Sequence, residues 1–114
     1  MNKILSALGL ANKAGALAVG TNNVLAAIKS GKARLVVISS DASENTVKLI
    51  SDKAGYRGIE VLSLTFSMNE IARALGRQRT SAVAITDDNL LAAFNKQLKA
   101  DKTAIRQIET EMHH

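Results

Sequence analysis

The chain has 114 residues, a length typical of one domain and sufficient to bury one core. Hydrophobic residues make up 46% of it, which is too apolar for a disordered chain, and only three residues are aromatic, so the core must be aliphatic. The absence of cysteine excludes disulfides, thiolate metal sites and thiol nucleophiles. A formal net charge of +5 favours an acidic partner such as nucleic acid, although many small proteins are mildly basic without binding one.

Apolar periodicity predicts helices alternating with short strands along the whole chain. The expected helices cover residues 2–13, 21–30, 41–54, 67–75 and 87–98, and the expected strands cover residues 16–19, 35–39, 59–64 and 81–86. With no proline, repeat or linker, this order predicts a single domain over residues 1–100. The expected fold class is α/β, a three-layer α/β/α sandwich with a mixed central sheet of about four strands.

Short polar residues and glycines mark the expected helix ends. Residues 41–44 and 67–70 both have the spacing of a capping box, in which the first residue caps the helix and a glutamate closes back onto it. Gly31, Gly55 and Gly76 follow helical segments and are expected to end them.

Residues 101–114 form a charged C-terminal extension, which we expect to be helical or frayed. Ile105, Ile108 and Met112 keep a helical rhythm there. His113 and His114 are either native or left over from an affinity tag, and they are left out of functional reasoning. The N-terminus lacks a signal peptide's long apolar region, and no apolar run is long enough to cross a membrane, so we expect a cytoplasmic monomer without membrane contact.

The sequence offers little for catalysis. Both histidines lie at the extreme C-terminus, so no internal histidine is present for a Ser–His pair or a metal site. Asp41, Asp87 and Asp88 follow strand ends, where enzymes often place catalytic groups, but capping a helix is the commoner role there. Neither a dinucleotide fingerprint nor a phosphate-binding loop occurs. We therefore expect no enzymatic activity, no cofactor and no metal.

Two segments favour binding instead. Gly20, Thr21, Asn22 and Asn23 open the second helix, where free backbone N–H groups and two side-chain amides suit anions and base edges. An ordinary helix start is the alternative. The second segment, residues 76–80, is a short basic loop between a helix and a strand, and its arginines either contact phosphate or form a solvated surface.

The aromatic content indicates which kind of nucleic acid the protein is expected to bind. Single-strand binders stack bases on several exposed rings, whereas only Tyr56 is free of the expected core here. DNA binding without sequence preference needs a denser basic face, so we expect no DNA partner. A structured RNA, bent or internally looped so that a helix can reach its base edges, fits better.

Four motifs, in order along the chain, resemble the L7Ae/L30e ribosomal protein family. They cover residues 20–24, 32–38 and 41–43, and residues 74–76 followed by 82–85. Residues 8–15 are similar, more narrowly, to the bacterial YlxQ-type members of that family. The resemblance spans residues 1–99. It implies an α/β/α sandwich that binds kink-turn RNA, an internal loop with tandem sheared G·A pairs and a sharp bend.

The resemblance also implies site residues. In the family, the start of the second helix contacts the guanines of the G·A pairs, and the loop before the last strand covers the bulged nucleotides. Carried over by position, these RNA-binding residues are Gly20, Thr21, Asn22 and Asn23, followed by Arg77, Gln78, Arg79, Thr80 and Ser81. Lys32 and Arg34 are further candidates for contacts with the RNA backbone.

The sequence departs from the archaeal family pattern at three places. Asn23 replaces a glutamate, so the side chain offers one acceptor and two donors in place of a carboxylate. Ala26 replaces a lysine, which removes a charge-assisted contact. The basic residues 77–79 replace an apolar loop, which favours phosphate contact over apolar packing.

We therefore expect a non-enzymatic RNA-binding protein, associated with the ribosome or another ribonucleoprotein, that recognises a kink-turn or similar bent internal loop. The alternative is a protein–protein adaptor on the same fold, acting in an RNA-related complex. That adaptor would dock a ribosomal or RNA-processing protein through the apolar positions of the C-terminal extension.

Overall fold

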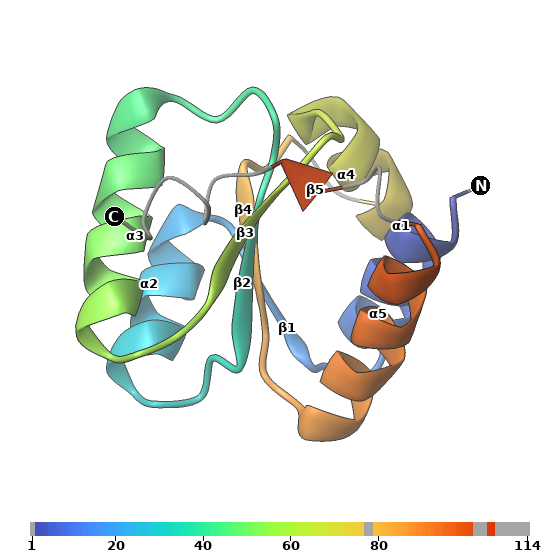
Figure 1. The fold of residues 1–114 in the computed structure, drawn as a ribbon, viewed down its shortest axis with the longest axis horizontal. Helices are drawn as coiled ribbons and strands as arrows, with labels where there is room; N and C mark the ends of the chain where they lie inside the picture. The colour runs from blue at the N-terminus through green and yellow to red at the C-terminus, as the bar shows by residue number, and fades with distance from the viewer. Residues whose placement is uncertain (1, 77–78, 102–104, 107–114) are drawn as a thin grey trace.

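Helices and strands alternate as the hydrophobic pattern predicts (Figure 1). The computed structural model describes residues 2–76 and 79–101, and the backbone of residues 105–106. The elements are α1 (Lys3–Lys13), β1 (Leu17–Val19), α2 (Thr21–Lys29), β2 (Leu35–Ile38), α3 (Glu44–Tyr56), β3 (Val61–Leu64), α4 (Met68–Leu75), β4 (Ala82–Ile85), α5 (Asp88–Ala100) and β5 (Ile105–Arg106). None of these helices is both long and apolar enough to cross a bilayer.

The strands form one mixed sheet in the order β1-β4-β2-β3-β5. β2 and β3 are parallel, and the other three pairings are antiparallel. Helices α2 and α3 cover one face, and α1, α4 and α5 cover the other (Figure 1). The predicted α/β/α sandwich with a mixed sheet is confirmed.

The central strand β2 is buried on both faces, as a continuous apolar run indicates. Leu35 and Val37 pack with α1, α4 and α5, whereas Val36 and Ile38 pack with α2 and α3. This alternation follows from the two-residue period of a strand. The sheet therefore separates two hydrophobic cores, and the one beneath α1, α4 and α5 contains the buried ring of Phe94.

The helix ends confirm one capping box and correct the other. Ser67 and Glu70 exchange both hydrogen bonds of the box at the start of α4. The capping role predicted for Asp41 is wrong, because Ser43 caps α3. The Asp41 carboxylate instead accepts a hydrogen bond from the backbone N–H of Met68 (2.9 Å), which no local spacing could indicate. Gly55 does not end α3 either, which continues to Tyr56.

The C-terminal extension differs from its prediction at the two residues where its backbone is described. α5 ends at Ala100, and Ile105 and Arg106 form a strand, neither helical nor frayed, that pairs antiparallel with β3. This pairing supplies hydrogen-bond partners to an edge of β3 that would otherwise be open.

Candidate nucleic-acid interface

Antiparallel pairing of β1 with β4 brings the two predicted binding segments together. β1 ends where β4 begins, with Val19 opposite Val83. Just beyond this pair, the backbone N–H of Gly20 donates to the carbonyl of Ala82 (3.0 Å). We call residues 20–23 the α2 turn and residues 77–81 the β4 loop. The described part of the β4 loop, residues 79–81, therefore adjoins the α2 turn directly.

The α2 turn leaves its helix start open. Gly20 precedes the helix with φ 96° and ψ 152°, a conformation that only glycine adopts without strain. Of the five described helices, α2 alone begins without a side-chain cap. Its first-turn N–H groups therefore remain available to an external acceptor, in the way that helix starts bind anions.

The two asparagines of the turn differ in their contacts. Both side chains are exposed, and Thr21 beside them is half-buried. The Asn23 amide donates from Nδ2 to the Val19 carbonyl (2.9 Å), which leaves Oδ1 free as an acceptor. Within the described part of the chain, Asn22 forms no side-chain hydrogen bond. The turn thus presents one oriented acceptor and one unengaged amide.

In the β4 loop, two residues are structural and one is exposed. The buried hydroxyl of Thr80 donates to the carbonyl of Ala82 (3.0 Å), and the carbonyl of Ser81 accepts from the N–H of Ser39 (2.9 Å). These contacts fix the backbone beside the α2 turn. Arg79 is exposed to solvent. The other two predicted loop residues, Arg77 and Gln78, lie outside the described residues.

Asp41 is a charged neighbour of this surface that the sequence did not indicate. The Met68 N–H that donates to its carboxylate lowers the pKa of Asp41, and the positive charge of Arg79 lowers it further by a smaller amount. The carboxylate is therefore ionised near neutral pH and offsets part of the arginine's charge.

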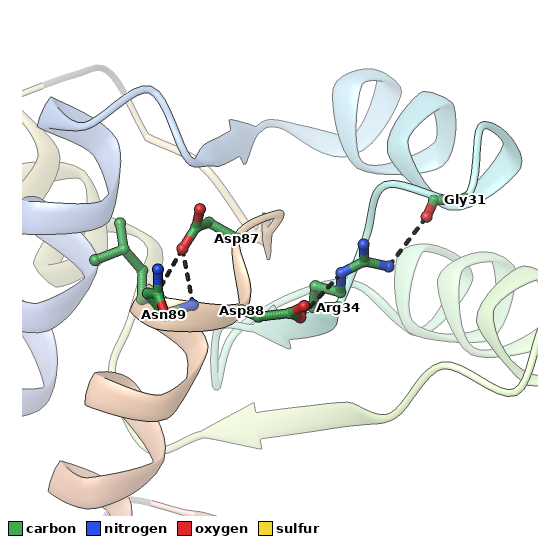
Figure 2. A network of polar contacts seen from close by, with 6 residues as sticks. Gly31, Arg34, Asp87, Asp88 and Asn89 are labelled. Atoms are coloured by element: carbon green, nitrogen blue, oxygen red, sulfur yellow. Dashed lines mark hydrogen bonds and ion pairs between the residues drawn. The ribbon is translucent and has the colours of Figure 1, made fainter.

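Arg34 lies at the opposite end of β4 from the α2 turn. Its backbone N–H donates to the carbonyl of Ile85, at the other terminus of the strand. Figure 2 shows the guanidinium between Gly31 and Asp88, with Nε 3.1 Å from the Asp88 carboxylate and a hydrogen bond of 3.3 Å to the Gly31 carbonyl. Asp87 fills the helix-capping role expected there. The fold therefore does not bring Arg34 to the α2 turn.

Lys32 is also distant from the turn but shares a groove with it. A groove of about 540 Å³ runs along β1 and the exposed side of α2, and Asn23, Ala26 and Lys32 are among its lining residues. Because Ala26 is small, the groove is open where the family pattern has a lysine. In the described residues, no group of histidine, aspartate or glutamate side chains has the arrangement of a metal site.

The fold and these segments match a known family. The model of the ribosomal protein L7Ae/L30e/S12e/Gadd45 family matches residues 2–94. The chain belongs to this family. The family resemblance read from the α2 turn and the flanking motifs is therefore confirmed.

Two bacterial relatives of this family member are named RNA-binding protein YlxQ. The one from Enterococcus faecium is 39% identical over 96 residues, which is 84% of this chain and 90% of the relative. The one from Bacillus subtilis (strain 168) is 35% identical over 80 residues, 70% of this chain and 79% of the relative. The large ribosomal subunit protein eL8 of Cenarchaeum symbiosum (strain A) is 34% identical over 91 residues, 76% of this chain and 69% of that protein.

Solved structures agree on the fold. A Bacillus halodurans C protein of unknown function superposes with a TM-score of 0.79 at 30% identity, over 87% of this chain and 99% of that one. The 15.5 kD RNA binding protein of Giardia lamblia superposes with a TM-score of 0.69 at 21% identity, over 88% and 85% of the two chains. The second likeness extends the shared fold to a distant sequence.

Proposed function

We propose that this L7Ae/L30e family member is a non-enzymatic RNA-binding protein that recognises a kink-turn or a similar bent internal loop. The binding surface is the α2 turn together with the β4 loop. One observation carries the proposal: an uncapped helix start with two exposed asparagines adjoins a loop with an exposed arginine. The names of the two bacterial relatives, which describe RNA-binding proteins, support the same class of partner.

Each group of this surface has a chemical role in the proposal. The Asn23 acceptor and the unengaged Asn22 amide contact base edges, because amides both donate and accept hydrogen bonds. The positive φ of Gly20 and its missing side chain let a base approach the backbone. Arg79, and with it Arg77, attracts phosphate. Lys32 contacts the RNA backbone farther along the groove, whereas Arg34 does not line this groove and pairs with Asp88.

A titration with paired RNAs tests this proposal. One RNA contains a kink-turn, and the other is identical except that Watson–Crick pairs replace the sheared G·A pairs. We expect weaker binding to the second RNA, because its straight helix hides the major-groove edges. Equal affinities would contradict recognition of the bend and leave only general electrostatic attraction.

A ribosomal or other ribonucleoprotein setting, a cytoplasmic location and a monomeric state belong to the same proposal. The adaptor alternative depends on the C-terminal extension, where Ile108 and Met112 lie outside the described residues. No described contact favours it over RNA binding.

A further inference from the structure

A second cavity, separate from the α2 turn, lies between the C-terminal halves of α2 and α3. Its volume is about 330 Å³, within the range of pockets that hold small ligands. It is lined by Leu25, Ile28, Lys29, Lys53, Tyr56 and Arg57. None of these residues belongs to the proposed RNA-binding surface.

The cavity combines an exposed aromatic ring with an apolar floor. Tyr56 is 88% exposed, whereas Phe94 is buried and Phe66 packs against the core under the opposite face of the sheet. Ile28 is buried and Leu25 is half-buried, so the floor is aliphatic. A free ring beside aliphatic side chains suits the flat face of one nucleobase. A single ring cannot support a run of stacked bases, so one nucleotide is the expected occupant.

The charges of the cavity complement a phosphate. Lys29, Lys53 and Arg57 line it, and no carboxylate of the described residues does. Among the described residues, the ion pair joins Arg34 to Asp88, and none of the three cations that line the cavity forms an ion pair with a described residue. Cations are favourable at helix C-termini, which accounts for charge at this place. The helix dipole does not account for the exposed ring or for the cavity beside it.

From this combination we infer that the cavity binds one single-stranded nucleotide of the RNA, its base on Tyr56 and its phosphate on the three cations. The inference rests on the proposed RNA-binding function and adds a second contact to it. α2 has nine residues, so its two ends are about 13 Å apart at 1.5 Å per residue. An unpaired strand that leaves the RNA bound at the α2 turn therefore runs along α2 to reach the cavity.

The test compares two kink-turn RNAs, one blunt and one with a single-stranded uridine extension. The substitution Tyr56→Leu removes the ring but keeps an apolar side chain, and Tyr56→Phe keeps the ring. We expect Tyr56→Leu to weaken binding of the extended RNA about tenfold, the effect of losing one stacked base, and to leave the blunt RNA unchanged. Tyr56→Phe should bind both RNAs like the unsubstituted chain. Thermal melting confirms that the variants fold.

The cations have a matched control on the same helix. Lys53→Gln should lower the salt dependence of extended-RNA binding, whereas Lys48→Gln, on an exposed α3 position outside the cavity, should not. The inference is overturned if Tyr56→Leu affects both RNAs equally or neither, or if the two lysine variants behave alike. Failure of the proposed function gives a different result. In that case, the blunt kink-turn RNA binds no better than the same RNA without its G·A pairs.

Discussion

Asn23 donates a hydrogen bond from its side-chain Nδ2 to the backbone carbonyl of Val19, at a distance of 2.9 Å. In an antiparallel pair, the backbone groups of successive residues point alternately toward and away from the partner strand. Because the N–H of Gly20 bonds to β4, the carbonyl of the preceding residue, Val19, points to the open edge of β1. The bond thus gives an edge carbonyl a partner and at the same time fixes which side of the amide faces outward. The same side chain both supports the fold and presents an acceptor.

The substitution Asn23→Ala removes both roles. We expect RNA affinity to fall by about 1–3 kcal/mol, as the loss of a base contact does. The free energy of unfolding should fall by only about 1 kcal/mol, because the lost bond is exposed to water. RNA titration and urea unfolding measure the two effects. A loss of stability with full RNA affinity would make Asn23 a structural residue only.

Asn22 is exposed and has no side-chain hydrogen bond within the described residues, so its substitution isolates binding from folding. We expect Asn22→Ala to weaken kink-turn binding by about 1–3 kcal/mol with an unchanged melting temperature. Asn95→Ala, at an exposed position of α5 in the other helical layer, is the control and should leave RNA affinity unchanged, with a small gain in stability from the higher helix propensity of alanine. Unchanged affinity for Asn22→Ala would remove this residue from the site.

Arg79 is expected to act through charge. In Arg79→Gln, the slope of log affinity against log salt should become shallower by about 0.7–0.9, the value for one phosphate contact. Lys96→Gln removes one positive charge from an exposed position on α5 and serves as the control for net charge. If both variants change the slope equally, Arg79 contributes only to the overall charge of the protein.

Gly20 and Gly55 offer a matched pair for backbone strain. An added Cβ meets no atom within 4 Å at either position, so crowding does not distinguish them. Gly20 has φ +96°, and Gly20→Ala should cost about 1–3 kcal/mol of stability from strain. Gly55 lies inside α3, and Gly55→Ala should stabilise the protein by about 0.5–1 kcal/mol. Urea unfolding measures both, and a tolerated Gly20→Ala would show that the turn relaxes into ordinary backbone geometry.

Asp41 predicts a pH dependence. Its pKa is lower in the folded protein than in the unfolded chain, chiefly because the Met68 N–H donates to the carboxylate. The resulting stabilisation is present above the unfolded-state pKa, near 4, and is lost as the pH falls through the lower folded value. The melting temperature should therefore fall less steeply below pH 5 in Asp41→Asn than in the unsubstituted chain. Parallel curves would contradict this role.

The same variant tests the neighbouring charge. Because Asp41 offsets part of the charge of Arg79, Asp41→Asn should bind RNA slightly more tightly at neutral pH and low salt, and the gain should vanish as salt rises. A weaker complex at low salt would indicate that Asp41 positions the surface instead.

Local patterns in the sequence determined the order of the elements and the fold class. Continuous apolar runs such as residues 35–38 produce strands buried on both faces, and the Ser67–Glu70 box fixes where α4 begins. These signals operate over a few residues, so they can be read without a structure. The positive φ of Gly31 and Gly76 likewise follows from the residue type and its place after a helix C-terminus.

Only the tertiary structure decided which residues lie together. The β1–β4 pairing places the α2 turn beside the β4 loop, and the same strand directions place Arg34 at the far end, bound to Asp88. Asp41 reaches Met68 and influences Arg79 across the chain, and Ile105 pairs with β3 where a helical or frayed extension was expected. Such contacts join residues distant in sequence, and their energies depend on strand register and chain path, which the local hydrophobic pattern does not encode.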